Sequence, residues 1–383
     1  MTEATVEQSF REWFGHSPSL VVHSPGRVNL IGDHTDYHDG LVLPAAINLG
    51  TDVAASSRDD RRLRVVAVRF DESDEISLDD FRPGSGPEWS HYVYGCVAML
   101  RSAGYAISGA DLLIDGDLPI GGGLSSSASL EMGVSVALTR LVGLDIDRPT
   151  LARLCQRVEN QIIGVQSGIM DQLAVACGVL DHALMIDCRS TDIELVPVPR
   201  SACLIIVDSG LPRTLAGSAY NERRMESTSA LAALQANAPG LAALRDVTMA
   251  LLARHAQNLD GTQLRRARHV VTENQRVRES ATALRHGDVE AFGRLMAASH
   301  VSLRDDYDVS VPELDLLVAT AMQTPGVLGA RMTGAGFGGC VVVLARTERA
   351  EDAAAHIPLE YTRLTGRPST AYQCRPSEGT RVR

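Results

Sequence analysis

The stretch that decides the fold reads Pro119-Ile120-Gly121-Gly122-Gly123-Leu124-Ser125-Ser126-Ser127-Ala128. It follows a strand-like apolar run at residues 112–114 and leads into residues 130–134, which have helical character. Three glycines let the backbone approach a ligand closely, and three serine hydroxyls stand where the first N–H groups of a helix lack partners. Such a helix start binds phosphate. The alternative is an ordinary turn of glycine and serine before a helix.

The chain contains no lysine, so all 36 of its basic residues are arginine. A Walker-type loop needs a lysine beside the β- and γ-phosphates, and a protein kinase needs one on a strand. The absence of lysine therefore excludes these two common kinds of nucleotide site.

The length and charge of the chain narrow its class further. At 383 residues it exceeds one ordinary core, so we expect two or three domains. Aromatic residues make up 4% of the chain, so the core should consist mainly of leucine, valine, alanine and isoleucine. The formal net charge of −11 argues against nucleic acid or an anionic membrane surface as a partner.

The cysteines and the N-terminus predict a cytoplasmic protein. Seven cysteines are scattered without a C-x-x-C pair, which is typical of reduced thiols rather than of disulfides or a zinc site. Residues 1–9 are polar and acidic, unlike a signal peptide, and no apolar run is long enough to span a bilayer.

Hydrophobic patterns divide the chain into two halves of mixed strands and helices. Residues 148–163 have apolar side chains at helical spacing, and Pro149 suits the first turn of that helix. Interspersed elements in two layers indicate α+β domains, which we place at residues 1–199 and 200–383. Strands are predicted at residues 20–23, 64–70, 110–115, 203–207 and 339–345, and long helices at 221–255 and 264–285.

A second segment, residues 24–37, concentrates polar side chains in Asp33, His34, Thr35 and Asp36. A polyhydroxyl ligand needs such a dense array of donors and acceptors, because each buried hydroxyl must find a partner. Two alternatives remain open. One is a metal site formed by His34, Asp36 and His38, although no second cluster supports it. The other is a solvated polar turn.

Two further segments carry acidic or glycine-rich signals. Glu159 lies in the helix predicted at 148–163, and Asp171 falls in the first turn of the next short helix, where the helix dipole favours a carboxylate. Acidic residues are common at such positions, so position alone does not make Asp171 catalytic. Residues 334–339 match G-x-G-x-x-G, but a strand follows rather than a helix, so the dinucleotide-binding interpretation fails. A glycine loop that approaches a ligand or another loop fits better.

Together these segments resemble, in order and through most of the chain, the galactokinase family of GHMP small-molecule kinases. Residues 26–37 resemble the galactokinase signature, 119–128 the phosphate loop, 164–172 the catalytic-aspartate segment and 333–340 the third motif. The resemblance implies an α+β fold with an N-terminal ribosomal-S5-domain-2-like mixed sheet, a ferredoxin-like C-terminal domain and an active site between them. It also implies phosphorylation of the anomeric hydroxyl of galactose by ATP with Mg²⁺. We expect a monomer.

The resemblance also implies roles for individual residues. Asp171 is the expected base for the C1 hydroxyl, although some accounts of the family assign it a positioning role, and Arg27 is expected to keep its carboxylate ionised. Ser127 and Glu159 match the magnesium ligands. Backbone N–H groups of Gly121, Gly122, Gly123, Leu124, Ser125, Ser126 and Ser127 match the phosphate contacts. Sugar contacts are expected from Asp33, His34, Thr35, Asp36, Gly168 and Tyr220, and adenine contacts from Trp89 and Tyr92.

Three positions depart from the family pattern. Galactokinases usually carry glutamate at the position of Asp33, asparagine at that of His38 and histidine at that of Arg213. Asp33 is one methylene shorter than the residue it replaces, which contacts the C6 hydroxyl. Either recognition at C6 is altered, admitting L-arabinose or a C6-modified galactose, or a water or backbone shift fills the gap.

Other functions are weighed against the kinase. A galactokinase-like sugar sensor would lack the Ser-Ala pair, which this chain keeps as Ser127 and Ala128. Kinases for mevalonate or homoserine do not fit the sugar segment, and N-acetylgalactosamine kinases usually carry isoleucine at the position of Thr35.

Overall fold

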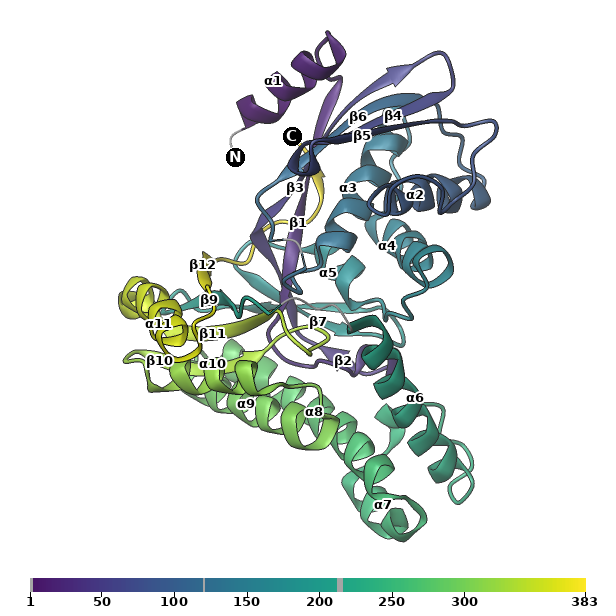
Figure 1. The fold of residues 1–383 in the computed structure, drawn as a ribbon. Helices are drawn as coiled ribbons and strands as arrows, with labels where there is room; N and C mark the ends of the chain where they lie inside the picture. The colour runs from purple at the N-terminus through teal and green to yellow at the C-terminus, as the bar shows by residue number, and fades with distance from the viewer. Residues whose placement is uncertain (1–2, 120, 212–215) are drawn as a thin grey trace.

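The computed structural model describes residues 3–119, 121–211 and 216–383, so the expectation for Arg213 lies outside the described residues. Strands and helices alternate in two groups, each built around its own sheet, which confirms the predicted α+β class. Figure 1 shows the sheet of the first half with α1–α5 at the top and the helices α6–α10 of the second half below. Within the described part of the chain, no helix is long and apolar enough to cross a membrane.

The first sheet has six strands in the order β13-β1-β3-β6-β4-β5 and is mixed, because β4 and β6 run parallel. Its alternating side chains cover both faces: Val53 of β3 faces the helices α2–α5, whereas Ala54 packs under α1 beside Phe10. The strands are β1 (Leu20–Asn29), β3 (Pro44–Arg58), β4 (Arg62–Ala67), β5 (Glu72–Ser77), β6 (Gly109–Gly116) and β13 (Arg381–Val382).

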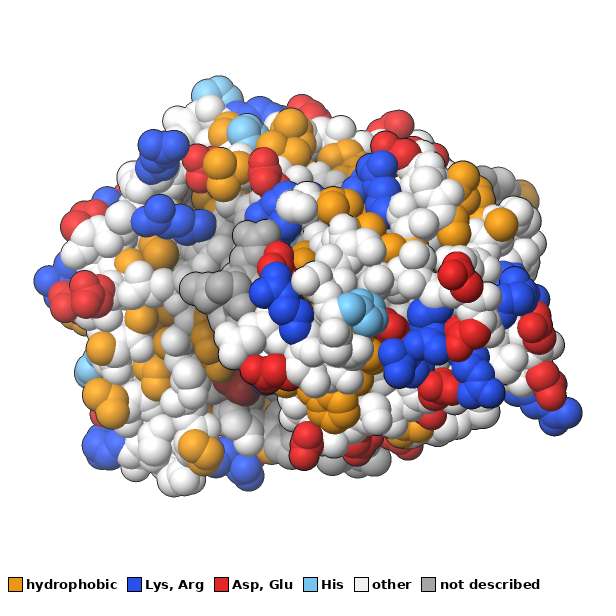
Figure 2. Space-filling model, turned by 90° about the horizontal axis from the view of Figure 1, so that it is seen from above, with side chains coloured by type: hydrophobic (Ala, Val, Ile, Leu, Met, Phe, Trp, Pro, Cys, Tyr) orange, Lys and Arg blue, Asp and Glu red, His pale blue; other side chains and the backbone are white. Residues whose placement is uncertain are grey.

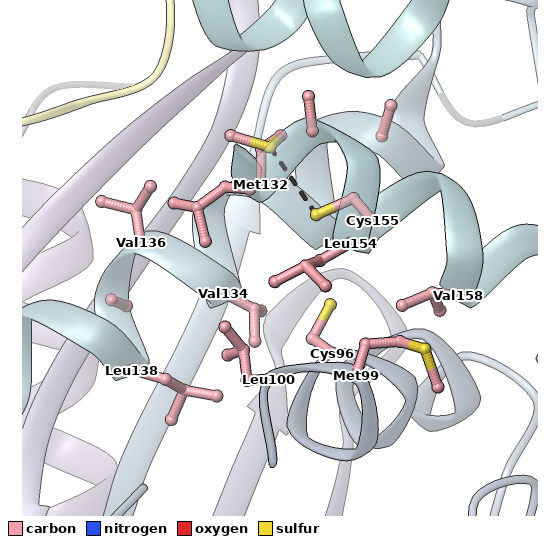
Figure 3. Packing of buried hydrophobic residues seen from close by; sticks show 14 of the residues in the cluster. Cys96, Met99, Leu100, Met132, Val134, Val136, Leu138, Leu154, Cys155 and Val158 are labelled. Atoms are coloured by element: carbon pink, nitrogen blue, oxygen red, sulfur yellow. Dashed lines mark hydrogen bonds between the residues drawn. The ribbon is translucent and has the colours of Figure 1, made fainter. Parts of the chain in front are cut away.

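The helices of the first half are α1 (Glu3–Phe14), α2 (Ser90–Ser102), α3 (Ser126–Leu141), α4 (Arg148–Val158) and α5 (Met170–Cys177). Figure 3 shows α3 held in place by apolar and sulfur-containing side chains of α2 and α4. Cys155 Sγ lies 3.6 Å from Met132 Sδ there. Because α3 is buried on nearly all sides, the loop at its start is anchored to a rigid core.

The second sheet has four antiparallel strands in the order β10-β11-β9-β12. The predicted strands at 203–207 and 339–345 are confirmed as β9 (Ala202–Asp208) and β11 (Cys340–Arg346), flanked by β10 (Val327–Met332) and β12 (Thr370–Cys374). A third, small sheet joins β2 (Leu41–Val42), β7 (His182–Asp187) and β8 (Ile193–Pro197). The boundary that we place after residue 199 lies in the connection between β8 and β9.

Three predicted elements differ from the structure. The helix expected at 221–255 is two helices, because Pro239 and Gly240, with φ +110°, interrupt it. The strand expected at 64–70 stops at Ala67 and continues as a 3₁₀ turn, Val68–Phe70, and the helix expected at 148–163 ends in a π turn, Glu159–Ile163. The helices of the second half are α6 (Ala216–Gln235), α7 (Met249–His255), α8 (Gly261–Arg285), α9 (Val289–Ser302), α10 (Pro312–Gln323) and α11 (Ala350–Thr365).

The surface mixes charges of both signs. On the face shown in Figure 2, arginine side chains lie beside acidic ones. The β4–β5 region illustrates how arginines are paired, with ion pairs of Arg58 to Asp60, Arg61 to Asp79 and Arg62 to Glu75. Such exposed pairs contribute little to stability.

Candidate active site

Two cavities share a wall formed by Gly121, Ser126 and Ser127 at the start of α3. The first cavity lies between the halves of the chain: β1 and the following turn supply one side, and Tyr220 of α6 with Gly334 and Ala335 supplies another. The second cavity lies between the first sheet and α2. The sequence segments selected for their chemistry therefore meet in one region.

Arg27 and Asp171 form a bidentate ion pair in the first cavity. Arg27 Nε and Nη2 donate to the two carboxylate oxygens of Asp171 at 2.9 and 2.8 Å, and Nη1 donates to the carbonyl of Gly123 at 2.6 Å. Ser125 Oγ donates to Asp171 Oδ2 at 2.5 Å. The structure thus places Arg27 beside Asp171, as expected, and fixes the carboxylate with three charge-assisted hydrogen bonds.

The 119–128 loop docks onto β1 through its backbone. The N–H of Arg27 donates to the carbonyl of Leu124 at 3.1 Å, and the Leu124 side chain is buried in the core. Gly121 and Gly123 have φ of +77° and +81°, which favour glycine. Gly122 and Leu124 are not among the described residues that line either cavity, whereas Gly121, Gly123, Ser125, Ser126 and Ser127 are.

Glu159 stands at the point where α4 changes into the π turn, a feature common at functional sites. Ser127 Oγ donates to one of its carboxylate oxygens at 2.7 Å and Ser167 Oγ to the other. Burial raises the pKa of Glu159, and these hydroxyl groups oppose the rise. A serine oxygen and a carboxylate side by side are hard ligands that suit Mg²⁺.

The alternative metal site of His34, Asp36 and His38 is not formed. Among the described residues, no group of three or more histidine, cysteine or acidic side chains could hold a metal ion. His38 is buried and its Nε2 lies 2.7 Å from Ser227 Oγ, and burial lowers its pKa to about 3.

His34 is held as a neutral donor by a chain of hydrogen bonds. Its Nε2 lies 3.2 Å from the carbonyl of Ala335, which can only accept, so Nε2 carries the hydrogen and Nδ1 accepts a hydrogen bond from Tyr37 OH at 2.8 Å. Burial lowers the pKa of His34 well below its usual value, consistent with this tautomer. Tyr37 OH in turn accepts from Tyr307 OH at 2.8 Å. Tyr307, which lies in the second half, was not predicted as a site residue.

The side chains of Asp33 and Thr35 have hydrogen-bond and ion-pair partners within the protein that the sequence does not suggest. Asp33 lines the first cavity, but one carboxylate oxygen pairs with Arg331 and the other accepts from the N–H of Gly334 at 3.0 Å. Thr35 is fully buried, and its hydroxyl donates to the carbonyls of Gly32 and Leu41 at 2.8 Å. The expectation that Thr35 contacts the sugar is therefore corrected: its side chain holds the turn and does not face the cavity.

Gly168 lies against Asp36 in the first cavity. A Cβ at Gly168 would stand 1.9 Å from Asp36 Oδ2, far closer than van der Waals contact allows. We expect Gly168→Ala to displace the Asp36 carboxylate and to lower kcat/KM for the sugar substrate that the resemblance implies at least tenfold. Gly261→Ala is the control, because a Cβ there meets only the end of Arg265 at 3.6 Å. Steady-state kinetics would contradict this prediction if both variants behaved alike.

The second cavity contains the predicted Trp89 and Tyr92, with Ser126 and Ser127 at its shared wall. Trp89 Nε1 donates to Glu72 Oε2 at 2.5 Å, which orients the indole. Phe70 and Arg69, which come from the 3₁₀ turn after β4, were not predicted to line this cavity. The shortening of the predicted strand at Ala67 could not be inferred from its apolar pattern.

Family models and curated relatives match most of the chain. The family model of the galactokinase galactose-binding signature matches residues 8–57, and those of the GHMP kinase N-terminal and C-terminal domains match residues 91–179 and 280–361. A galactokinase of Roseiflexus sp. is 48% identical over 374 residues, covering 98% of this chain and 95% of the relative. One of Exiguobacterium sibiricum is 44% identical, covering 100% and 98%.

Solved structures are similar as well. Galactokinase of Lactococcus lactis, in complex with galactose, superposes with a TM-score of 0.95 at 39% identity and covers 99% of both chains. A mevalonate kinase has a TM-score of 0.67 at 20% identity and covers 93% of this chain and 99% of its own, a likeness of fold alone.

Proposed function

The chain belongs to the galactokinase family of GHMP kinases, and on this premise we propose what each residue of its two cavities does. It has the two-domain GHMP kinase fold and phosphorylates the anomeric hydroxyl of galactose with ATP, giving galactose 1-phosphate and ADP. We propose that the domains are residues 1–199 and 200–383, with the active site between them. The observation that carries the residue assignment is the bidentate ion pair of Arg27 with Asp171 in the first cavity.

Asp171 is the general base in this proposal. Its carboxylate accepts the proton of the C1 hydroxyl while that oxygen attacks the γ-phosphorus of ATP and ADP leaves. Arg27 is the counter-ion of this carboxylate, and its positive charge also offsets negative charge on the transferred group. The hydrogen bonds from Arg27 and Ser125 fix the carboxylate, which also supports the alternative that Asp171 acts by positioning the hydroxyl.

The two cavities divide the substrates. Galactose lies in the first cavity against Asp33, His34, Asp36, Gly168 and Tyr220. The adenine lies in the second against Trp89 and Tyr92, with the phosphates over the shared wall of Gly121, Ser126 and Ser127. We further propose that the enzyme acts as a monomer. All seven cysteines, each within the described residues, are free thiols, which supports a cytoplasmic location.

The test of the function is an ADP-release screen across galactose, arabinose, glucose, mannose, N-acetylgalactosamine and galactosamine. Galactose is expected to give the highest kcat/KM. A higher kcat/KM for arabinose would favour the related-sugar alternative raised by Asp33, whereas tight binding of galactose without ADP release would favour a sugar sensor.

Magnesium would be held by Ser127 and Glu159. When bound, Mg²⁺ offsets phosphate charge during transfer. With two protein oxygens here, the remaining positions are free for phosphate and water, as Mg²⁺ commonly requires.

We expect Glu159→Gln to raise the Mg²⁺ concentration for half-maximal activity at least tenfold, because a neutral amide is a weaker ligand. Binding of Mn²⁺, followed by electron paramagnetic resonance, should weaken in parallel. Glu222→Gln, on the exposed side of α6, is the matched control. An unchanged metal requirement in Glu159→Gln would place the metal elsewhere.

The affinity for galactose should depend on pH through Asp36. Burial, with the nearby charge of Asp171, raises the pKa of Asp36 to about 7. As pH rises from 6 to 8 the ionised fraction should climb from about a tenth to about nine-tenths. Because a carboxylate accepts hydroxyl hydrogen bonds more strongly than a carboxylic acid, KM for galactose should fall several-fold over that range. Asp36→Asn should have a high KM that is flat in pH; an unaltered pH dependence would refute the assignment.

A further inference from the structure

The second cavity holds one arginine among its described lining residues, Arg69, and two acidic residues, Glu88 and Asp115. Arg69 is exposed, and it lies in the 3₁₀ turn that ends β4. Its Nη1 donates to the carbonyl of Leu118. Since Leu118 directly precedes the 119–128 loop, this hydrogen bond ties the guanidinium to the base of that loop.

The other arginines at the site are already neutralised. Arg27 gives three of its nitrogens to Asp171 and the carbonyl of Gly123, and Arg331 is paired with Asp33 in the protein interior. For Arg69, no carboxylate lies within ion-pair distance among the described residues. A guanidinium carries five N–H donors, so most of those on Arg69 remain available to a ligand.

The negative charge of the nucleotide favours a further positively charged side chain at the site. The lining of the first cavity carries four carboxyl groups, Asp33, Asp36, Glu159 and Asp171, against Arg27 as its one arginine among the described residues. The 119–128 loop has no cation of its own, and the lysine that Walker-type loops supply is absent from the chain. Mg²⁺ at Ser127 and Glu159 would offset part of the charge of a triphosphate. Among the described residues that line the two cavities, however, Arg27 is the only arginine besides Arg69, and it is held by Asp171.

We propose that Arg69 binds the phosphate tail of the nucleotide and supplies the fixed positive charge that the phosphate loop lacks. The inference rests on the proposed function, because it takes the second cavity as the nucleotide site. Arginine suits this role, since its planar fork matches phosphate oxygens and it stays charged at every physiological pH. The 3₁₀ turn, rather than a longer β4, is what brings Arg69 into the cavity lining.

The test compares Arg69→Gln and Arg69→Lys with Arg62→Gln, an exposed position at the other end of β4 that pairs with Glu75. Arg69→Gln should raise KM for ATP and the dissociation constant of ADP, from calorimetry, about tenfold, and Arg69→Lys should recover part of the loss. The dissociation constant of adenosine, which has no phosphate, and KM for galactose should stay within twofold in all variants. High salt should narrow the difference in ADP binding between Arg69→Gln and wild type.

Two results would overturn the inference. One is ADP binding by Arg69→Gln equal to that of Arg62→Gln. The other is an equal loss for adenosine and ADP, which would assign Arg69 to the shape of the base pocket. ADP binding can be measured without turnover. A wild-type protein that binds ADP but does not phosphorylate galactose would therefore refute the proposed function, and the effect of Arg69→Gln on ADP binding would still test the role of Arg69.

Discussion

Replacing Asp171 by asparagine is expected to lower kcat for galactose phosphorylation by about 10³-fold. An amide cannot take the proton of the C1 hydroxyl, and it also leaves Arg27, which is nearly fully buried, without its anionic partner. Galactose binding should persist, because the contacts expected from Asp36, Gly168 and Tyr220 are unchanged. Coupled detection of ADP gives kcat, and calorimetry gives the galactose dissociation constant.

Asp145→Asn is the matched control for this substitution, since Asp145 is exposed and pairs with Arg140 at the surface. It should retain wild-type kcat. If Asp171→Asn kept more than about a tenth of the wild-type kcat, general-base catalysis would be the wrong description and the positioning role would take its place.

Replacing Arg331 by methionine is expected to lower the free energy of unfolding by about 3–5 kcal/mol. Arg331 and Asp33 are 0% and 1% exposed, so removing the guanidinium leaves an unpaired carboxylate in the interior. The pair links the turn after β1 to the end of β10, so its loss should also raise KM for galactose. Urea unfolding followed by circular dichroism, together with steady-state kinetics, measures both effects.

Two further variants make this prediction decisive. Arg346→Met removes an arginine of the same second sheet from an exposed pair with Glu290, so it should cost no more than about 1 kcal/mol. Combining Asp33→Asn with Arg331→Met leaves neither side chain of the pair charged and should recover part of the lost stability. Equal stability of the two single arginine variants would show that the buried pair contributes nothing.

Much of the fold could be predicted because its signals are local. The apolar runs that became β1, β6, β9 and β11, and the helical spacing of α8, are visible within single windows of the sequence. Eight of the strands that the structure describes were not predicted: β2, β3, β5, β7, β8, β10, β12 and β13. The shortest of them, β2 and β13, have two residues each and are defined by their distant partners, β7 and β1. The helix break at Pro239 and Gly240 was visible in principle, since both residues interrupt helices.

The site was predictable to the extent that motifs carry it. The segments that supply Arg27, Asp171, Ser127 and Glu159 could be selected by their residue types and resemblance, and the structure brings them into contact. The sequence could not predict that the hydroxyl of Thr35 bonds to the carbonyls of Gly32 and Leu41, because this depends on how the backbone of the turn folds.

Three other site features depend on contacts between distant segments. The grip of Arg331 on Asp33, the Tyr307–Tyr37–His34 chain and the place of Arg69 in the second cavity join residues that no sequence window contains. Nothing in the spacing of Arg331 or Tyr307 along the sequence revealed their partners.

Because β13 pairs with β1, the edge of the first sheet can close only after synthesis of the chain has reached β13. On one side Val22 and His23 pair with Val53 and Asp52 of β3, which are synthesised soon after β1. On the other side they pair with Val382 and Arg381 of β13. A ribosome makes the chain from the N-terminus, so β1 keeps an open edge until translation has passed residue 382. The strand that carries Arg27 is therefore synthesised well before the strand that closes its edge.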